Sequence, residues 1–159
     1  TLLKAFKLVI KKAKCNLLII GEGSEKENIE NYIRNNDLGN YVKLLGYKSN
    51  PWKYLSKSNL FVLSSIWEGF GNVIVESMLL GIPVISTRCK SGPAEILDNG
   101  KYGKLYDIYD YTKLSELILN EISSKELKNN SNIAKKRSED FSIDKITESY
   151  IKAFDELLT

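Results

Sequence analysis

Short apolar runs alternate along this chain with segments whose apolar residues recur every three or four positions. Each run is too short for a typical helix and is bounded by Gly, Asn, Ser or Pro, so each predicts a buried strand. The predicted strands are 16–20, 41–45, 60–63, 83–86 and 103–106. Helical spacing covers 2–10, 24–36, 52–56, 73–80, 93–97, 114–122 and 142–157. This alternation predicts an α/β fold, an open and mostly parallel sheet covered by helices.

Residues that favour helix ends stand at several of these boundaries. Ser24 and Glu27 have the spacing of a capping box. Asn50 followed by Pro51 predicts an N-cap and a first helical position. Gly81 predicts the end of the helix that begins near Val73.

Three aromatic residues follow the second predicted strand. Trp52 and Tyr54 have helical spacing, and such residues are more often core anchors than stacking platforms for a base. We therefore expect both in the core. Tyr47 differs because it directly follows the end of a strand, where ligands of parallel sheets bind.

The amino-acid composition excludes several classes of function. The 159 residues suffice for one domain, with 43% hydrophobic and 27% charged residues. A net charge of +3 does not indicate nucleic-acid binding. The absence of His excludes a Ser-His-Asp triad and His-ligated metals. The two cysteines, Cys15 and Cys89, are expected to be reduced, and no leader or membrane-spanning run is recognisable. Because the chain starts inside an amphipathic pattern, we expect it to be part of a longer protein.

The most informative stretch is 59–97, which predicts a strand, a Gly-rich turn, a helix and a second strand. The turn is Gly69-Phe70-Gly71-Asn72, and the helix continues from Val73. Unpaired N–H groups at a helix start, with glycines that permit close approach, form an anion site. Carboxylates accept hydrogen bonds from sugar hydroxyls, and two of them flank this turn, Glu68 and Glu76. The combination predicts a ligand with both phosphate and vicinal hydroxyls, such as a nucleotide sugar.

The two glutamates enclose seven residues, GFGNVIV, and GIPVIST follows the helix. This pattern resembles the retaining glycosyltransferases of the GT-B fold, group 1 or family 4. The resemblance implies that residues 1–159 are the C-terminal, donor-binding domain, a Rossmann-like three-layer half of the fold, with the acceptor-binding N-terminal domain absent.

The resemblance also assigns roles to residues. It places Glu76 on the ribose and Glu68, the catalytic candidate, near the reacting donor sugar. It places the N–H groups of Gly69, Phe70, Gly71, Asn72 and Val73 on the diphosphate and sugar. The loop of Gly21 and Gly23 is placed near the donor, and Tyr47 beside the base.

The implied activity is transfer of a sugar from a nucleotide-diphosphate sugar, with UDP favoured, to a glycan or lipid-linked acceptor. Retention of configuration and a role in bacterial surface polysaccharide synthesis are implied as well. No metal site or cofactor is expected. A cytoplasmic location, open to peripheral association with the inner face of the membrane, is expected. Two alternatives remain: a non-catalytic nucleotide- or phosphate-binding Rossmann-like module, and a GT-B sugar-nucleotide epimerase.

The family's strand order, 3-2-1-4-5-6, has a further implication. The five strands found here correspond to strands 2 to 6, so the central strand would be missing. We therefore expect an interruption between Asn16–Ile20 and Leu60–Leu63, and an isolated chain that folds poorly and transfers no sugar. The final helix is expected, from the same resemblance, to pack against the partner domain.

Overall fold

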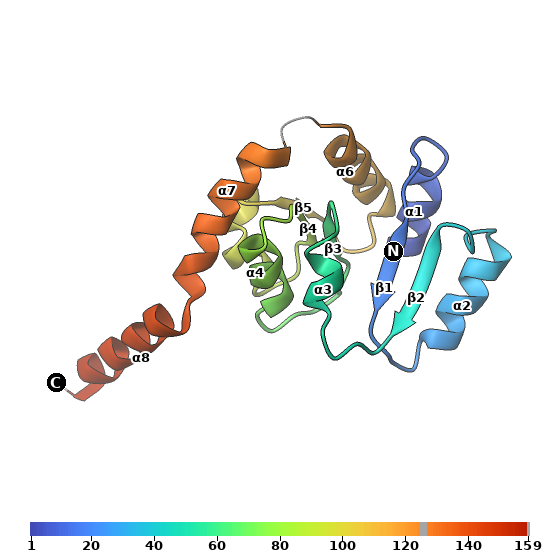
Figure 1. Ribbon diagram of the computed structural model, residues 1–159. Helices are drawn as coiled ribbons and strands as arrows, with labels where there is room; N and C mark the ends of the chain where they lie inside the picture. The colour runs from blue at the N-terminus through green and yellow to red at the C-terminus, as the bar shows by residue number, and fades with distance from the viewer. Residues whose placement is uncertain (125–126, 159) are drawn as a thin grey trace.

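The computed structural model describes residues 1–124 and 127–158. Five parallel strands lie in two separate sheets, and helices cover them (Figure 1). One sheet pairs β1 (Leu17–Ile20) with β2 (Val42–Gly46), and the other has the order β3 (Phe61–Leu63), β4 (Val84–Thr87), β5 (Lys104–Tyr106). The predicted α/β class and all five predicted strands are confirmed.

Helices connect the strands in the predicted alternation. They are α1 (Leu2–Val9), α2 (Lys26–Asn35), α3 (Trp52–Leu55), α4 (Asn72–Leu79), α5 (Pro93–Ile96) and α6 (Tyr111–Ser123). The chain ends with α7 (Leu127–Ser138) and α8 (Ile143–Leu158), and two short 3-10 helices are η1 (Asp98–Gly100) and η2 (Glu139–Phe141).

The predicted interruption between β1 and β3 is present. Within the described residues these two strands share no ladder, and each has a hydrogen-bonded neighbour on one side only. Leu17 donates its N–H to the Tyr41 carbonyl at 2.8 Å, and Phe61 donates to Pro83 at 2.9 Å. Because alternate residues of a parallel strand face opposite neighbours, the peptide groups of Leu18 and Val62 are directed toward the space between the sheets.

The core lies on both faces of the three-stranded sheet. On β4, Ile85 packs into a cluster with residues of α1 and α6, whereas Val84 packs into a second cluster with residues of α4 and α5. Val62 and Phe61 of β3 divide in the same way. This alternation with a period of two makes the three-layer arrangement, with α1 and α6 on one face and α4, α5 and α7 on the other.

Of these predicted helix ends, Gly81 is confirmed, whereas the helix starts at Asn50-Pro51 and Ser24 are each one residue too early. Gly81 adopts φ 71° directly after α4 and its C-cap. α3 begins at Trp52 with Pro51 at its N-cap, and the Asn50 side chain accepts the N–H of Lys53 at 3.2 Å. The predicted capping box of Ser24 and Glu27 does not form, because α2 begins one residue later, with Glu25 at its N-cap and no capping side chain.

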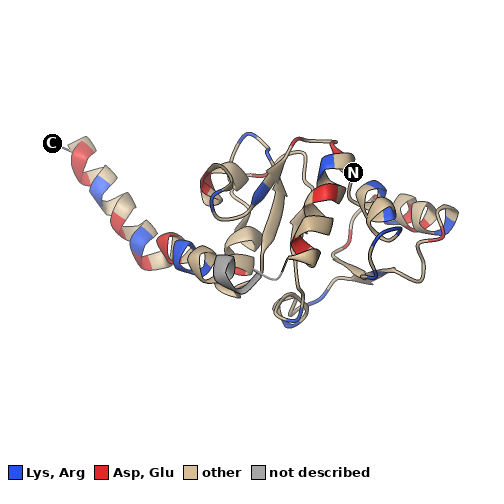
Figure 2. Cartoon of the chain, turned by 90° about the horizontal axis from the view of Figure 1, so that it is seen from above, with Lys and Arg blue, Asp and Glu red and all other residues tan. Residues whose placement is uncertain are grey.

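α8 extends away from the strands (Figure 1), whereas α7 packs beside α4 and contacts α5. Arg137 of α7 donates to the carbonyls of Glu95 and Ile96 at the end of α5, at 3.1 and 3.4 Å. Beyond η2, α8 exposes its apolar side chains, including Tyr150 and Phe154. Blue and red residues are interspersed along α2 and α8, without a single field of positive charge (Figure 2). Among the described residues, every helix is too short or too polar to cross a membrane.

Candidate functional site

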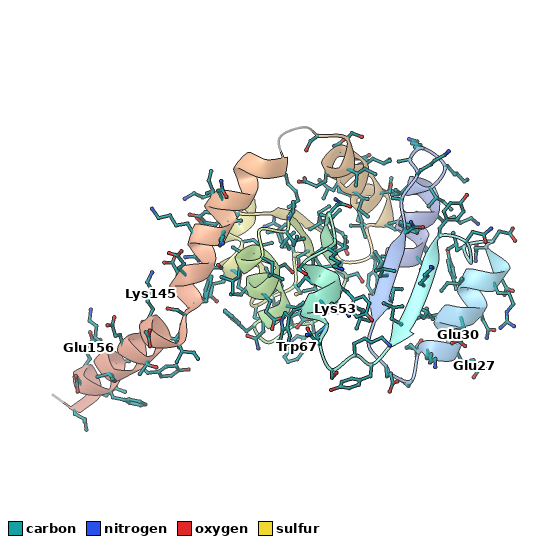
Figure 3. All side chains as sticks on the ribbon, in the orientation of Figure 1. Glu27, Glu30, Lys53, Trp67, Lys145 and Glu156 are labelled. Atoms are coloured by element: carbon teal, nitrogen blue, oxygen red, sulfur yellow. The ribbon has the colours of Figure 1, made fainter. Side chains whose placement is uncertain are left out.

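The predicted site residues lie in the loops that follow the carboxyl ends of the strands, or on α4, the helix that follows the loop after β3. The arrowheads of β1 and β2 point to the lower edge of Figure 1, and Trp67, in the loop after β3, is labelled at that same edge in Figure 3. Loops at this edge hold ligands in open parallel sheets because helix N-termini also converge there. Trp67 is 73% exposed, so the loop after β3 is open to a ligand.

The turn before α4 presents peptide N–H groups. Gly71 is the N-cap of α4 with φ 95° and ψ 52°, a left-handed conformation that glycine adopts without strain. Within the described residues, no acceptor is found for the N–H groups of residues 69 to 73. Gly69 and Asn72 are exposed and Val73 is half-buried, so the turn offers a positive helix end to solvent.

The Phe70 side chain anchors this turn from behind. Its ring meets that of Phe141 edge to face, with centroids 5.4 Å apart, within the cluster formed by α4, α5 and α7. The guanidinium of Arg137 lies 4.7 Å from the Phe141 ring centroid on the same side. Phe70 therefore contributes its backbone to the open face and its ring to the core.

Three hydroxyl groups fix the loop that carries Glu68. Ser65 Oγ donates to Glu68 Oε1 at 2.6 Å, and Ser91 Oγ donates to the Glu68 carbonyl at 2.6 Å. Thr87 Oγ1 at the end of β4 donates to the Ser65 carbonyl, also at 2.6 Å. The Glu68 carboxylate is thus oriented by a chain of hydrogen bonds that starts in the sheet. Sequence analysis did not identify Ser65 or Ser91 as supports, because their contacts depend on tertiary structure.

The loop before α5 packs directly against the Gly-rich turn. Gly92 has φ 69°, and a Cβ atom there would lie 2.0 Å from the Phe70 carbonyl oxygen. Only a residue without a side chain permits this approach. Pro93 follows at the first position of α5, as predicted.

Glu76 lies on α4, four residues after its first residue, which is about 6 Å along the axis. Trp52 Nε1 donates to Glu76 Oε2 at 2.9 Å and joins α3 to α4. The prediction that Trp52 is a core anchor is wrong, since its side chain is 48% exposed and belongs to neither core cluster. Helical spacing could not reveal this contact, which spans 24 residues.

The remaining predicted residues form a second group after β1 and β2. Gly21 donates its N–H to the Gly46 carbonyl at 3.0 Å, and the N–H of Tyr47 lies 3.4 Å from Glu22 Oε1. Gly23 is exposed, and the Tyr47 side chain is 70% exposed. No hydrogen bond or ion pair within the described residues joins this group directly to Glu68 and the Gly-rich turn. Tyr47 is only five residues before Trp52, whose side chain contacts Glu76. The two groups are therefore connected through this short backbone segment.

Beneath the site, Tyr106 is buried and donates its hydroxyl to the Leu63 carbonyl at 3.4 Å. Burial raises the pKa of this hydroxyl, so it stays protonated and serves as a donor. Cys15 and Cys89 are free thiols. In the described part of the chain, no three His, Cys, Asp or Glu residues form a group that could hold a metal ion.

Known families and solved structures include relatives of this chain. Residues 1–138 match the model of the family "Glycosyl transferases group 1". An uncharacterized glycosyltransferase of Methanocaldococcus jannaschii is 35% identical, over 94% of this chain and 44% of its own length. A relative from Campylobacter jejuni is 32% identical, over 89% of this chain and 39% of its own length. It is an N-acetylgalactosamine-N,N'-diacetylbacillosaminyl-diphospho-undecaprenol 4-alpha-N-acetylgalactosaminyltransferase.

A solved structure is similar over almost the whole chain. The Staphylococcus aureus TarM mutant, in complex with fondaparinux, alpha-GlcNAc-glycerol and UDP, is 28% identical with a TM-score of 0.87. The similarity covers 96% of this chain and 31% of that one. The chain spans about two fifths of the length of the two curated relatives it matches. On the family match and these similarities, the chain belongs to the group 1 glycosyltransferases and has the Rossmann-like α/β architecture of a GT-B C-terminal domain.

Proposed function

We propose that this chain supplies the nucleotide-sugar site of an enzyme that transfers a sugar with retention of anomeric configuration. The donor is a UDP-sugar, and the acceptor is a glycan or a lipid-linked glycan. The observation that carries the proposal is the turn of residues 69 to 73, whose N–H groups have no acceptor within the described residues, between the half-buried carboxylates of Glu68 and Glu76.

Each part of this arrangement matches one part of the ligand. The N–H groups at the start of α4 suit the diphosphate, because the helix end carries a partial positive charge. The Glu76 carboxylate has two oxygens and suits the vicinal hydroxyls of ribose. Glu68, oriented by Ser65, suits a hydroxyl of the donor sugar near its reacting carbon.

The chemistry follows from these positions. The bond between the anomeric carbon and the diphosphate oxygen breaks, and its electron pair leaves with the nucleoside diphosphate. The acceptor oxygen bonds to the same carbon, and its proton passes to an oxygen of the leaving diphosphate. The negative charge that develops on the diphosphate is stabilised by the N–H groups of residues 69 to 73, which are already oriented. We propose that this stabilisation needs no metal, so that transfer continues in the presence of a chelator.

The relatives support the choice of donor and acceptor. The TarM mutant structure contains UDP, and the Campylobacter relative is named for an undecaprenol-linked acceptor and an alpha linkage. Both bacterial proteins are larger than this chain, which covers 31% and 39% of them. We propose that the acceptor is bound mainly by protein outside these 159 residues, and that the reaction occurs at the cytoplasmic side of the membrane in surface glycan synthesis.

A panel of nucleotide sugars tests the proposal on the complete protein. UDP-sugars should raise its melting temperature more than GDP-sugars or free sugars, because binding to the native state stabilises it. Incubation of the best donor with an acceptor and a chelator should release UDP and give a product with the anomeric configuration of the donor. Donor binding without any transfer would instead favour a non-catalytic module, and no nucleotide binding would reject the site.

The first mutational prediction concerns Glu76. Glu76→Gln should weaken UDP binding by about 1.5–3 kcal/mol, since hydrogen bonds from the ribose to a charged carboxylate are lost. Glu30→Gln is the matched control, because Glu30 projects from the exposed face of α2, away from Trp67 (Figure 3). Calorimetry on the complete protein measures both. If Glu76→Gln binds UDP as tightly as the control, Glu76 does not contact the ribose.

A further inference from the structure

Trp52 occupies a position that packing alone does not explain. It is the first residue of α3, a helix of 4 residues, and 48% of its surface is exposed. It is absent from both hydrophobic clusters of the core, although Trp is among the residues that gain most from burial. Its polar atom, by contrast, is well placed, with Nε1 donating to Glu76 Oε2 at 2.9 Å.

The bond matters because it is the one contact found for the Glu76 carboxylate among the described residues. Within the described residues, no second hydrogen bond and no ion pair is found on the Glu76 carboxylate. A Glu side chain with free rotation loses rotamer entropy when a ligand orders it, which weakens binding. Trp Nε1 donates one hydrogen bond and accepts none, so it occupies one acceptor position on Oε2 and leaves Oε1 available.

We propose that Trp52 is a positioning residue that holds the Glu76 carboxylate ready for the two ribose hydroxyls and thereby selects ribonucleotides. The inference rests on the proposed function, because it presumes that Glu76 binds the ribose. A carboxylate fixed by the indole presents Oε1 and the second lone pair of Oε2 to a vicinal diol. A nucleotide without these hydroxyls gains nothing from the fixed orientation, so the effect of Trp52 should depend on the diol.

The test compares UDP with 2',3'-dideoxyuridine diphosphate on the complete protein. Trp52→Phe keeps an aromatic ring and removes the N–H donor. It should raise the Kd for UDP about 3- to 10-fold, because the carboxylate loses its fixed orientation but keeps its contact with the ribose, and leave the Kd for the dideoxy compound unchanged. In a Glu76→Gln background, Trp52→Phe should have less effect on UDP. Tyr54→Phe, an aromatic substitution on the same helix, is the control.

The outcomes distinguish the positioning role of Trp52 from the ribose contact of Glu76 on which it rests. If wild-type protein prefers UDP to the dideoxy compound and Trp52→Phe retains that preference in full, Trp52 does not position Glu76 and the proposed function stands. If Trp52→Phe weakens the binding of both nucleotides equally, Trp52 supports the structure of the site without acting on the diol, and the inference is rejected. If the wild-type protein itself shows no preference for the diol, Glu76 does not bind ribose, and both the inference and the proposed role of Glu76 are rejected.

A spectroscopic measurement tests the contact without any change to Trp52. The 159 residues contain 2 tryptophans, Trp52 and Trp67, and the indole N–H signal of each is assigned in the complete protein by its loss on substitution. Glu76→Gln should shift the Trp52 indole signal and leave that of Trp67 in place. UDP should shift the Trp52 signal more than the dideoxy compound does. An unmoved Trp52 signal in Glu76→Gln would overturn the inference.

Discussion

At the scale of single residues, the site depends on close backbone approach and on hydroxyl groups that orient carboxylates. Ser65 and Ser91 hold Glu68 from two sides, and Gly92 brings its loop against the carbonyl of Phe70. These residues bear no charge in the reaction that we propose. Their effect is to keep the N–H groups and carboxylates in place before a ligand arrives, which lowers the cost of binding.

The close approach at Gly92 should contribute to the stability of the protein. Gly92→Ala should destabilise the protein by at least about 2 kcal/mol, because Ala is strained at φ 69° and its Cβ would lie 2.0 Å from the Phe70 oxygen. The displaced turn should also bind UDP more weakly. Chemical denaturation and calorimetry measure the two effects.

Gly39→Ala is the matched control for Gly92→Ala. A Cβ at Gly39 would have no atom within 4 Å, and the φ of Gly39 is not positive. Its unfolding free energy should stay within about 0.5 kcal/mol of wild type. Equal stabilities for the two variants would show that the close approach at Gly92 does not hold the loops together.

At the scale of elements, periodicity predicted what depends on local sequence. The apolar runs located all five strands, and Pro93 and Gly81 marked helix ends correctly. Other predictions failed. The capping box of Ser24 and Glu27 does not form, because α2 begins one residue later. Trp52 was misplaced in the core, because its partner lies 24 residues away on another helix. Contacts between elements, such as Ser91 with Glu68, leave no periodic trace in the sequence.

The interruption between the two sheets should lower the protection of nearby amides against hydrogen exchange. In the 159-residue chain, the amides of Leu18 and Val62 should exchange with solvent through openings that cost little free energy. Ile85 pairs with strands on both sides, so the opening that exposes its amide should cost nearly the global free energy of unfolding. Hydrogen exchange followed by NMR measures this difference. Equal protection at all three amides would mean that another backbone segment pairs with β1 and β3.

At the scale of the whole molecule, the three-layer core holds the loops of the proposed site in place. Parallel strands bring five loops to one edge, the helix cluster behind Phe70 holds the Gly-rich turn, and α3 reaches α4 through Trp52. The donor site that we propose is thus supported by the face of the three-stranded sheet that α4, α5 and α7 cover. The apolar side chains of α8 are exposed and take no part in the donor site that we propose.

The most direct test of the central claim is a crystal structure of the complete protein with UDP. The account predicts ribose hydroxyls about 2.5–3.0 Å from the Glu76 carboxylate oxygens and diphosphate oxygens about 2.7–3.2 Å from N–H groups of residues 69 to 73. It also predicts that Trp52 keeps its hydrogen bond to Glu76. UDP bound at another edge of the sheet, or bound here with its ribose turned away from Glu76, would contradict the account.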